Sequence, residues 1–227
     1  MTTLYCRPAH RIALTVKPQL ASWDFAGSPG QVRLGDFLDH AEAAAAPTIA
    51  AIDGPLAVEL TVGLPGELAL TSGGRDLDNY LLPLAQRLGP TRIVAMFGRK
   101  TRGPSFLAVV QAQPDHVASP PQFSAQMAGS YVREEWKVTL REQLLQVQPA
   151  VPAVGAIGMT IGITTGPGRN WTNIWKPLID AFGPILDENS GRPFHPNDDR
   201  ITSLGLHHNV NNAIGHDVII TAWWMTL

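Results

Sequence analysis

Short apolar runs, several of them alternating with polar residues, recur along the chain, and this pattern is typical of β-strands. The runs lie at residues 11–17, 58–64, 92–97, 106–110, 158–164, 201–210 and 217–225. Between them, helices are predicted at residues 34–46, 80–88, 131–146 and 170–182. In the third of these, Val132, Trp136, Leu140 and Leu144 lie on one helical face. Pro47 is expected to end the first helix. Together these segments predict an α+β fold with a mixed β-sheet and short helices.

Strands and helices follow one another in the same order in the two parts of the chain. Asn79 and Asn173 occupy matching places at two short helices and stand 94 residues apart. Pro120-Pro121 is typical of a linker. We therefore expect two similar halves, residues 1–113 and 114–227, that form a pseudo-dimer. Strand–helix–strand order also recurs by chance in α+β proteins, so an unduplicated fold is the alternative.

The composition narrows the classes of function. Hydrophobic residues make up 44% of the 227 residues and charged residues 16%, which excludes a disordered chain. The formal net charge of −2 provides no overall positive field for nucleic acid, although a local patch can still bind it. The single cysteine, Cys6, excludes an internal disulfide and a cysteine-rich zinc site. Because the sequence has neither a run of about 18 apolar residues nor a start typical of a signal peptide, we expect no membrane partner and a cytoplasmic location.

Two pairs of aspartates are candidate metal ligands. Asp76 and Asp78 follow a glycine-rich loop at a strand-to-helix junction, where two carboxylates can face one hard cation such as Mg²⁺. Helix capping is the alternative, because Asp and Asn are favoured at helix N-termini. Asp198 and Asp199 precede a strand and can add a ligand, with the second side chain pointing away from the first. A polar turn explains this second pair equally well.

Several basic residues are candidates for phosphate contact. Lys176 shares a helical face with Asn173, and a lysine beside a metal–carboxylate site can neutralise phosphate charge. An exposed helix lysine is the alternative. The residues expected to contact nucleic acid are Arg99, Lys100 and Arg102 in a predicted basic turn, together with Arg92, Arg169, Lys176 and Arg200. A solvated hairpin tip explains the turn equally well.

Histidines supply the only alternative metal set, which comprises His195, His207, His208 and His216. Adjacent residues of a strand point to opposite faces, so His207 and His208 are poorly placed to bind one zinc ion.

Residues 168–182, followed by residues 197–201, resemble the core of the RusA-like Holliday-junction resolvases. The family pattern is Asp-x-Asp-Asn-x-x-Lys, then a short helix ending in an Asp-Ala-Leu type of segment, then Asp-Asp and a strand that bears isoleucine. The matching positions are Asn173, Lys176, Asp180, Ala181, Asp198, Asp199 and Ile201. The resemblance covers most of the second half, from about residue 106 onward.

The two halves depart from the family pattern at different positions. In the second half, Asn170 and Thr172 stand where the family has its first two aspartates. The first half keeps that pair as Asp76 and Asp78, but it has Leu82 in place of the lysine and lacks the later Asp-Asp pair. Neither half alone carries the complete set.

The resemblance implies Mg²⁺-dependent hydrolysis of phosphodiester bonds in branched or structured DNA by a homodimer; two fused copies would make one chain a monomeric pseudo-dimer. It implies catalytic roles for Asp76, Asp78, Lys176, Asp198 and Asp199, with the four aspartates as metal ligands. The aspartates either form one composite site across the halves or belong to two sites that decayed separately. A non-catalytic binding module of the same fold is a second hypothesis, and an unrelated enzyme or structural protein is a third.

Overall fold

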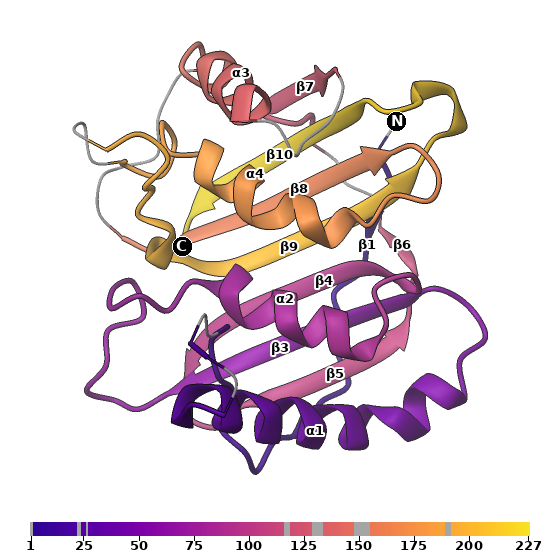
Figure 1. The fold of residues 1–227 in the computed structure, drawn as a ribbon, viewed down its shortest axis with the longest axis vertical. Helices are drawn as coiled ribbons and strands as arrows, with labels where there is room; N and C mark the ends of the chain where they lie inside the picture. The colour runs from indigo at the N-terminus through magenta and orange to yellow at the C-terminus, as the bar shows by residue number, and fades with distance from the viewer. Residues whose placement is uncertain are drawn as a thin grey trace.

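In the computed structural model, an eight-stranded mixed β-sheet carries the α-helices on one face (Figure 1). The structure describes residues 2–21, 24–25, 27–115, 119–128, 134–147, 155–188 and 192–227. The strand order is β2-β5-β3-β4-β9-β8-β10-β7, and β1 pairs with β6 in a separate two-stranded ribbon. The α+β class and the mixed sheet are as the sequence predicts.

The strands are β1 (Leu4–Tyr5), β2 (Ile12–Ala13), β3 (Leu56–Leu64), β4 (Ile93–Arg102), β5 (Phe106–Gln111), β6 (Pro114–Asp115), β7 (Phe123–Met127), β8 (Ile157–Thr165), β9 (Ile201–Val210) and β10 (Val218–Thr226). The α-helices are α1 (Pro29–Ala50), α2 (Leu77–Leu88), α3 (Glu134–Leu144) and α4 (Trp175–Ala181). Short 3₁₀ turns are η1 (Trp171–Ile174), η2 (Asp198–Arg200) and η3 (Asn212–Ile214).

Strands β5, β3 and β4 pair with one another in the same way as β10, β8 and β9. In each group the middle strand is parallel to one neighbour and antiparallel to the other. Both parallel pairs have a register shift directly after their first residue, Leu56 in β3 and Ile157 in β8. The groups meet at the antiparallel pair β4–β9, whose register is centred on Phe97 opposite Gly205. A half-turn about this point therefore superimposes the strand order of one group on that of the other.

Alternation along the strands divides the buried residues between the two faces of the sheet. In β3, Val58 belongs to the main hydrophobic core together with Phe37 of α1 and Leu81 of α2. Its neighbour Ala57 belongs to a smaller cluster with Phe97 of β4, on the face away from the helices. The helices thus cover one face of the sheet, and Leu77 and Leu81 of α2 pack over Gly98 of β4.

Two predicted elements differ in length from the structure. Helix α1 runs through Pro47 to Ala50, because the proline removes one backbone hydrogen bond while Ala45 and Ile49, on either side of it, pack in or against the core. The strand predicted at residues 11–17 shortens to Ile12–Ala13, which pairs only with the start of β5 at the sheet edge.

The structure differs from the predicted elements at three further places, and one predicted position lies outside the described residues. Residues 99–102 form the end of β4, paired with β3 up to Leu64 opposite Arg102, and not a basic turn. The helix predicted at 170–182 starts as the 3₁₀ turn η1 before α4. Strand β7 pairs with β10 and was not predicted. Val132, assigned to the face of the third predicted helix, lies outside the described residues.

Candidate metal site

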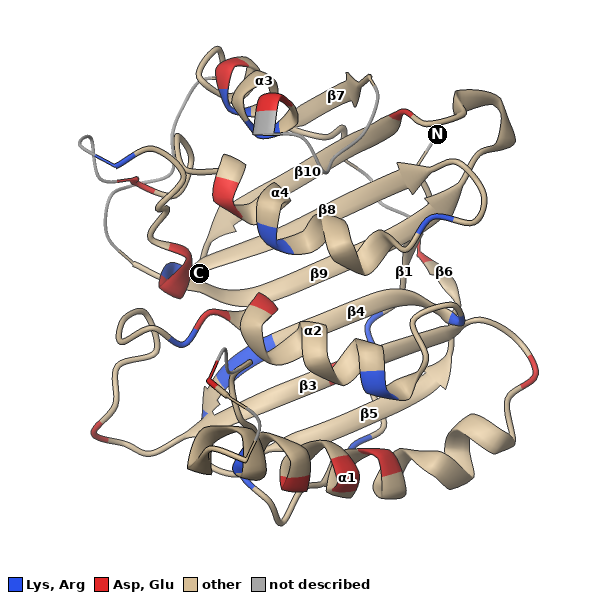
Figure 2. Cartoon of the chain, viewed as in Figure 1, with Lys and Arg blue, Asp and Glu red and all other residues tan. Residues whose placement is uncertain are grey.

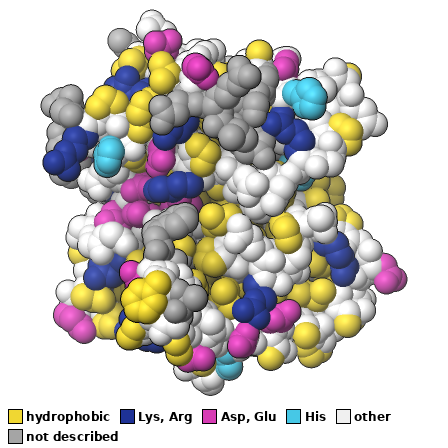
Figure 3. All heavy atoms as spheres, in the orientation of Figure 1, with side chains coloured by type: hydrophobic (Ala, Val, Ile, Leu, Met, Phe, Trp, Pro, Cys, Tyr) yellow, Lys and Arg dark blue, Asp and Glu magenta, His cyan; other side chains and the backbone are white. Residues whose placement is uncertain are grey.

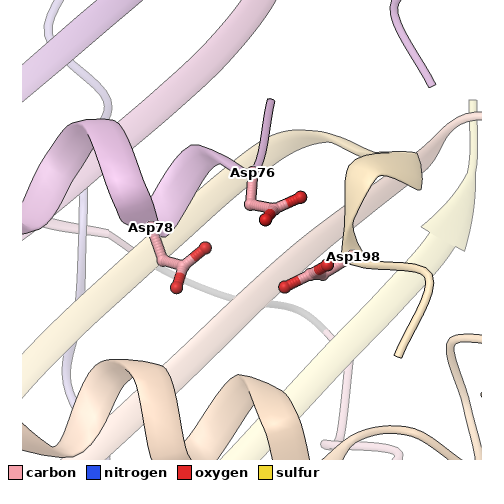
Figure 4. Close-up of side chains that lie close together, drawn as sticks. All are labelled: Asp76, Asp78 and Asp198. Atoms are coloured by element: carbon pink, nitrogen blue, oxygen red, sulfur yellow. The ribbon is translucent and has the colours of Figure 1, made fainter. Parts of the chain in front are cut away.

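Two segments far apart in the sequence bring three carboxylates together at one edge of the sheet. Helix α2 follows β3, with Asp76 at its N-cap and Asp78 in its first turn. Because β9 runs antiparallel to β4, the 3₁₀ turn that precedes β9 and contains Asp198 lies at the same edge. One carboxylate oxygen from each of the three aspartates lies within 4.8 Å of the other two. In Figure 4 the three side chains point toward a common centre. We call these three residues the acidic triad.

Helix capping does not account for Asp76. Its backbone is extended, as an N-cap requires, but its side chain accepts no hydrogen bond from the backbone of α2. Its carboxylate instead accepts a hydrogen bond of 3.1 Å from the side-chain amide of Asn79. The carboxylate therefore remains directed toward Asp78 and Asp198.

Lys176 of α4 lies beside the acidic triad. Its ammonium nitrogen is 3.0 Å from a carboxylate oxygen of Asp198 and 3.7 Å from one of Asp78. It is also 3.2 Å from Asp180, one helical turn further along α4. Figure 3 shows acidic and basic side chains gathered on this face of the molecule, at the boundary between the two groups of strands. The predicted lysine and three of the four predicted aspartates thus come together.

Asp199 has a different role from the one predicted. Its two carboxylate oxygens accept hydrogen bonds of 2.6 Å from the backbone N–H groups of Gly74 and Arg75. The fully buried ammonium of Lys100 is 3.7 Å from this carboxylate and donates to the Asp199 carbonyl at 2.6 Å. Asp199 therefore anchors the loop that leads to Asp76, and it does not join the triad because its oxygens already hold that loop.

The crowding of carboxylates changes their proton affinities. Burial raises the pKa of Asp76 to about 7, and the negative charges of Asp198, Asp199 and Asp78 add to this effect. Burial likewise raises the pKa of Asp78 to about 6, although Lys176 opposes the shift. Negative charge at this edge is therefore costly near neutral pH, and an additional cation would relieve it.

The two lysines respond to the same environment in opposite ways. Burial acts to lower the pKa of Lys176, but Asp78, Asp198 and Asp180 outweigh burial and raise it. Lys176 therefore stays charged throughout the neutral range. Burial dominates for Lys100 and lowers its pKa despite the nearby Asp199.

The residues predicted to bind nucleic acid do not form one patch. Lys100 and Arg200 are buried, 3% and 2% exposed, so neither presents its charge to a surface ligand. Arg99 points to the face opposite Lys100, as neighbours in a strand do, and lies 3.4 Å from the buried Glu59. The positions of Lys and Arg residues are dispersed over the fold in Figure 2.

The other predicted arginines contact backbone carbonyls. Arg102 donates to the carbonyls of Pro65 and Leu68, and Arg169 donates to that of His216. Arg92 donates to carbonyls at and after the end of α1, including those of Ile49 and Gly54. Arg169 follows β8, whose last residue lies at the sheet edge opposite the acidic triad.

Sequence reasoning missed a basic hollow beside the acidic triad. This hollow, of about 530 Å³, is lined by Lys17, Arg33 and Arg75 among other residues, with Asp24 also in its wall. The sequence offered one signal for this hollow: the basic residue Arg75 directly precedes Asp76. Lys17 and Arg33 come from distant segments, and nothing in the sequence indicated that they lie near Asp76. A larger hollow of about 830 Å³ is lined by Thr164 and Trp223 among others and includes no member of the triad.

The histidines do not form the alternative metal set. The ring of His207 lies against Tyr5 and Phe97, whereas the ring of His208 stacks on Trp171. The two side chains therefore point to opposite faces of the sheet, as expected for neighbours in β9. Burial lowers the pKa of His207 to about 3 and that of His208 to about 4, so both are neutral at pH 7.

No protein-family model matches the chain, and no curated protein is similar to it. Among the described residues, no helix combines the length and the apolar character needed to cross a bilayer. The geometry of the acidic triad therefore carries the functional argument.

Proposed function

We propose that the protein is a divergent, RusA-like, metal-dependent endonuclease that hydrolyses phosphodiester bonds in branched or structured DNA. The observation that supports this most directly is the acidic triad with Lys176 beside it. Asp76 and Asp78 come from the part of the chain that keeps the family's aspartate pair, whereas Lys176 and Asp198 come from the part that keeps the lysine and the Asp-Asp pair. The two parts of the chain, each of which lacks some of the family's charged residues, together supply one group of three aspartates and a lysine.

The donor atoms of the triad fit a hard divalent cation. Mg²⁺ takes oxygen ligands at about 2.0–2.1 Å in octahedral geometry, so two of its ligand atoms stand about 3–4 Å apart. One carboxylate oxygen from each of Asp76, Asp78 and Asp198 lies within 4.8 Å of the other two, so a small inward movement of the side chains would bring the three atoms to this spacing. When bound, such an ion would polarise a phosphate oxygen and lower the pKa of a bound water.

The residues around the triad have roles that follow from their charges. Lys176 remains protonated and partly exposed, so it is placed to stabilise the negative charge that develops on a phosphate in the transition state. Lys17, Arg33 and Arg75 around the adjacent hollow would hold the phosphates of the neighbouring nucleotides. These three residues replace Arg99, Lys100 and Arg200 as the expected DNA contacts, while Lys176 keeps its predicted one.

The proposal includes a duplicated architecture. The register shift after Leu56 in β3 recurs after Ile157 in β8, and the strands around both positions pair in the same order. Such agreement over whole strands is not expected from strand–helix–strand order alone. We infer that the chain is a pseudo-dimer of two RusA-like units joined through β4 and β9, with Mg²⁺ as the physiological ion.

One observation favours a non-catalytic binding module instead. Lys176 already supplies a positive charge to Asp78 and Asp198, so part of the cluster is neutralised without a metal. In such a module the acidic triad would stabilise only the contact between α2, α4 and the turn before β9. The two functions differ in whether the carboxylates bind a divalent cation.

Cleavage of a labelled four-way junction with Mg²⁺ or Mn²⁺ tests the proposal. We expect cutting by the wild type and its loss in both Asp76→Asn and Asp198→Asn. Asp53→Asn, at an exposed position away from the site, is the matched control and should cut normally. Calorimetric titration with Mn²⁺ should show binding that either site substitution weakens. No cutting and no Mn²⁺ binding by the wild type would overturn the nuclease proposal in favour of the binding module.

A further inference from the structure

The half-turn that relates the two groups of strands identifies a second position equivalent to the acidic triad. Residues 56 and 157 start β3 and β8, and residues 93 and 201 start β4 and β9, with matching registers throughout. The same half-turn matches the start of η1 with the start of α2 and places it toward the opposite edge of the sheet. Any second site would therefore lie where η1 approaches the start of β4.

The residues at this second position carry no carboxylate. Asn170 is the N-cap of η1, as Asp76 is the N-cap of α2, and Thr172 stands where Asp78 does. By the offset between β9 and β4, Asp198 corresponds to Pro90. Leu82 takes the place of Lys176. Each acidic or basic group of the first site is thus matched by a neutral residue.

The second position has also acquired its own packing. The Asn170 side chain accepts hydrogen bonds from both the backbone N–H and the hydroxyl of Thr172, so its oxygen caps the turn. Trp171 between them stacks on His208, with parallel rings 5.0 Å apart. Asn170 and Thr172 thus bond to each other, and neither is a hard anionic ligand. Among the described residues, only the acidic triad groups three acidic or metal-ligating side chains in this way.

We propose that the chain cuts one strand per binding event, so that it nicks branched DNA. This inference rests on the proposed nuclease function and adds that the pseudo-dimer has one working site. In that step, a water oxygen forms a bond to phosphorus and loses a proton, the bond from phosphorus to the leaving ester oxygen breaks, and that oxygen takes up a proton. The opposite strand stays intact because Asn170, Thr172 and Pro90 replace the carboxylates there.

A supercoiled plasmid with an extruded inverted repeat distinguishes one cut from two. Two coordinated cuts give a linear product, whereas one nick releases the supercoiling, the cruciform is reabsorbed and the reaction stops at the nicked circle. We expect the nicked circle as the end product with Mg²⁺. Asp76→Ser should abolish the reaction, and the matched Asn170→Ser should keep it, since serine is favoured at the N-cap position that both residues occupy.

Titration with Mn²⁺ provides a readout that does not depend on activity. Binding should be weakened in Asp76→Ser and unchanged in Asn170→Ser, with thermal melts confirming that both variants fold. A linear product formed directly by the wild type, or loss of Mn²⁺ binding in Asn170→Ser, would overturn the single-site inference while leaving the nuclease proposal intact. No cutting and no Mn²⁺ binding by the wild type would overturn both.

Discussion

Replacing Asp76 by asparagine is expected to stabilise the metal-free protein at neutral pH, although it removes a group from the candidate site. The carboxylate is half-buried beside other acids, and its pKa rises from 3.8 to about 7 on folding. The folded state therefore binds the proton more tightly than the unfolded state. The free energy of unfolding of the wild type then falls as pH rises from about 4 through 7, and the variant lacks this dependence.

The size of the stability gain follows from the shift in the pKa of Asp76. A difference of about three pKa units at 1.36 kcal/mol each gives an upper limit of about 4 kcal/mol. Because the Asp76 side chain is partly exposed, solvent screens the repulsion, and about 2 kcal/mol is a realistic gain. Asparagine has nearly the same shape and keeps an acceptor oxygen for the side-chain amide of Asn79, so packing should change little.

Urea denaturation in EDTA at pH 4.5, 6 and 8 measures the effect. The advantage of Asp76→Asn over the wild type should grow from about 1 kcal/mol at pH 4.5, where the carboxyl is already mostly ionised in the unfolded state, to about 2 kcal/mol at pH 8. Mn²⁺ should reverse the order at pH 8, because only the wild type gains stability from the bound ion. Asp53→Asn is the control for the substitution itself. An advantage of Asp76→Asn that is equal at all three pH values would refute the electrostatic reasoning.

Three further predictions address the surroundings of the site. Lys176→Gln should raise the affinity for Mn²⁺ on the order of tenfold, because the ammonium group 3.0 Å from Asp198 no longer competes with the metal. The same substitution should abolish cutting. Calorimetry tests the first effect and junction cleavage the second. Asp199→Ala should lower the free energy of unfolding by about 3 kcal/mol, because the buried Lys100 loses its carboxylate neighbour and the N–H groups of Gly74 and Arg75 lose their acceptors. Adding Lys100→Met should recover part of this loss in urea denaturation. Gly63→Ala should cost about 2 kcal/mol, because a Cβ there would lie 2.0 Å from the Gly103 carbonyl oxygen; an unchanged thermal midpoint would contradict that contact.

The repeated order of strands and helices, and the acidic pairs beside them, could be predicted from the sequence. Alternation and helical spacing depend on the few residues next to each position, so β3, α2, β8 and β9 appear close to their predicted limits. The location of Asp76 and Asp78 at a helix start, and of Asp198 just before a strand, follows from the same local patterns. Local patterns do not show which other side chains those carboxylates face.

The pairing of strands that are far apart in the sequence decided which of these side chains come together. The contact between Asp198 and the start of α2 depends on β9 lying antiparallel beside β4, and that pairing joins residues more than 100 positions apart.

By itself, then, the sequence determined the approximate limits of β3, α2, β8 and β9 and which charged groups stand at their ends, because neighbouring side chains settle those choices. Only the tertiary structure decided that three carboxylates and Lys176 share one edge, that Lys100 and Arg200 are buried, and that the equivalent edge is neutral. Those outcomes depend on how strands pack across the sheet, and the periodicity of a strand is the same whichever partner it pairs with.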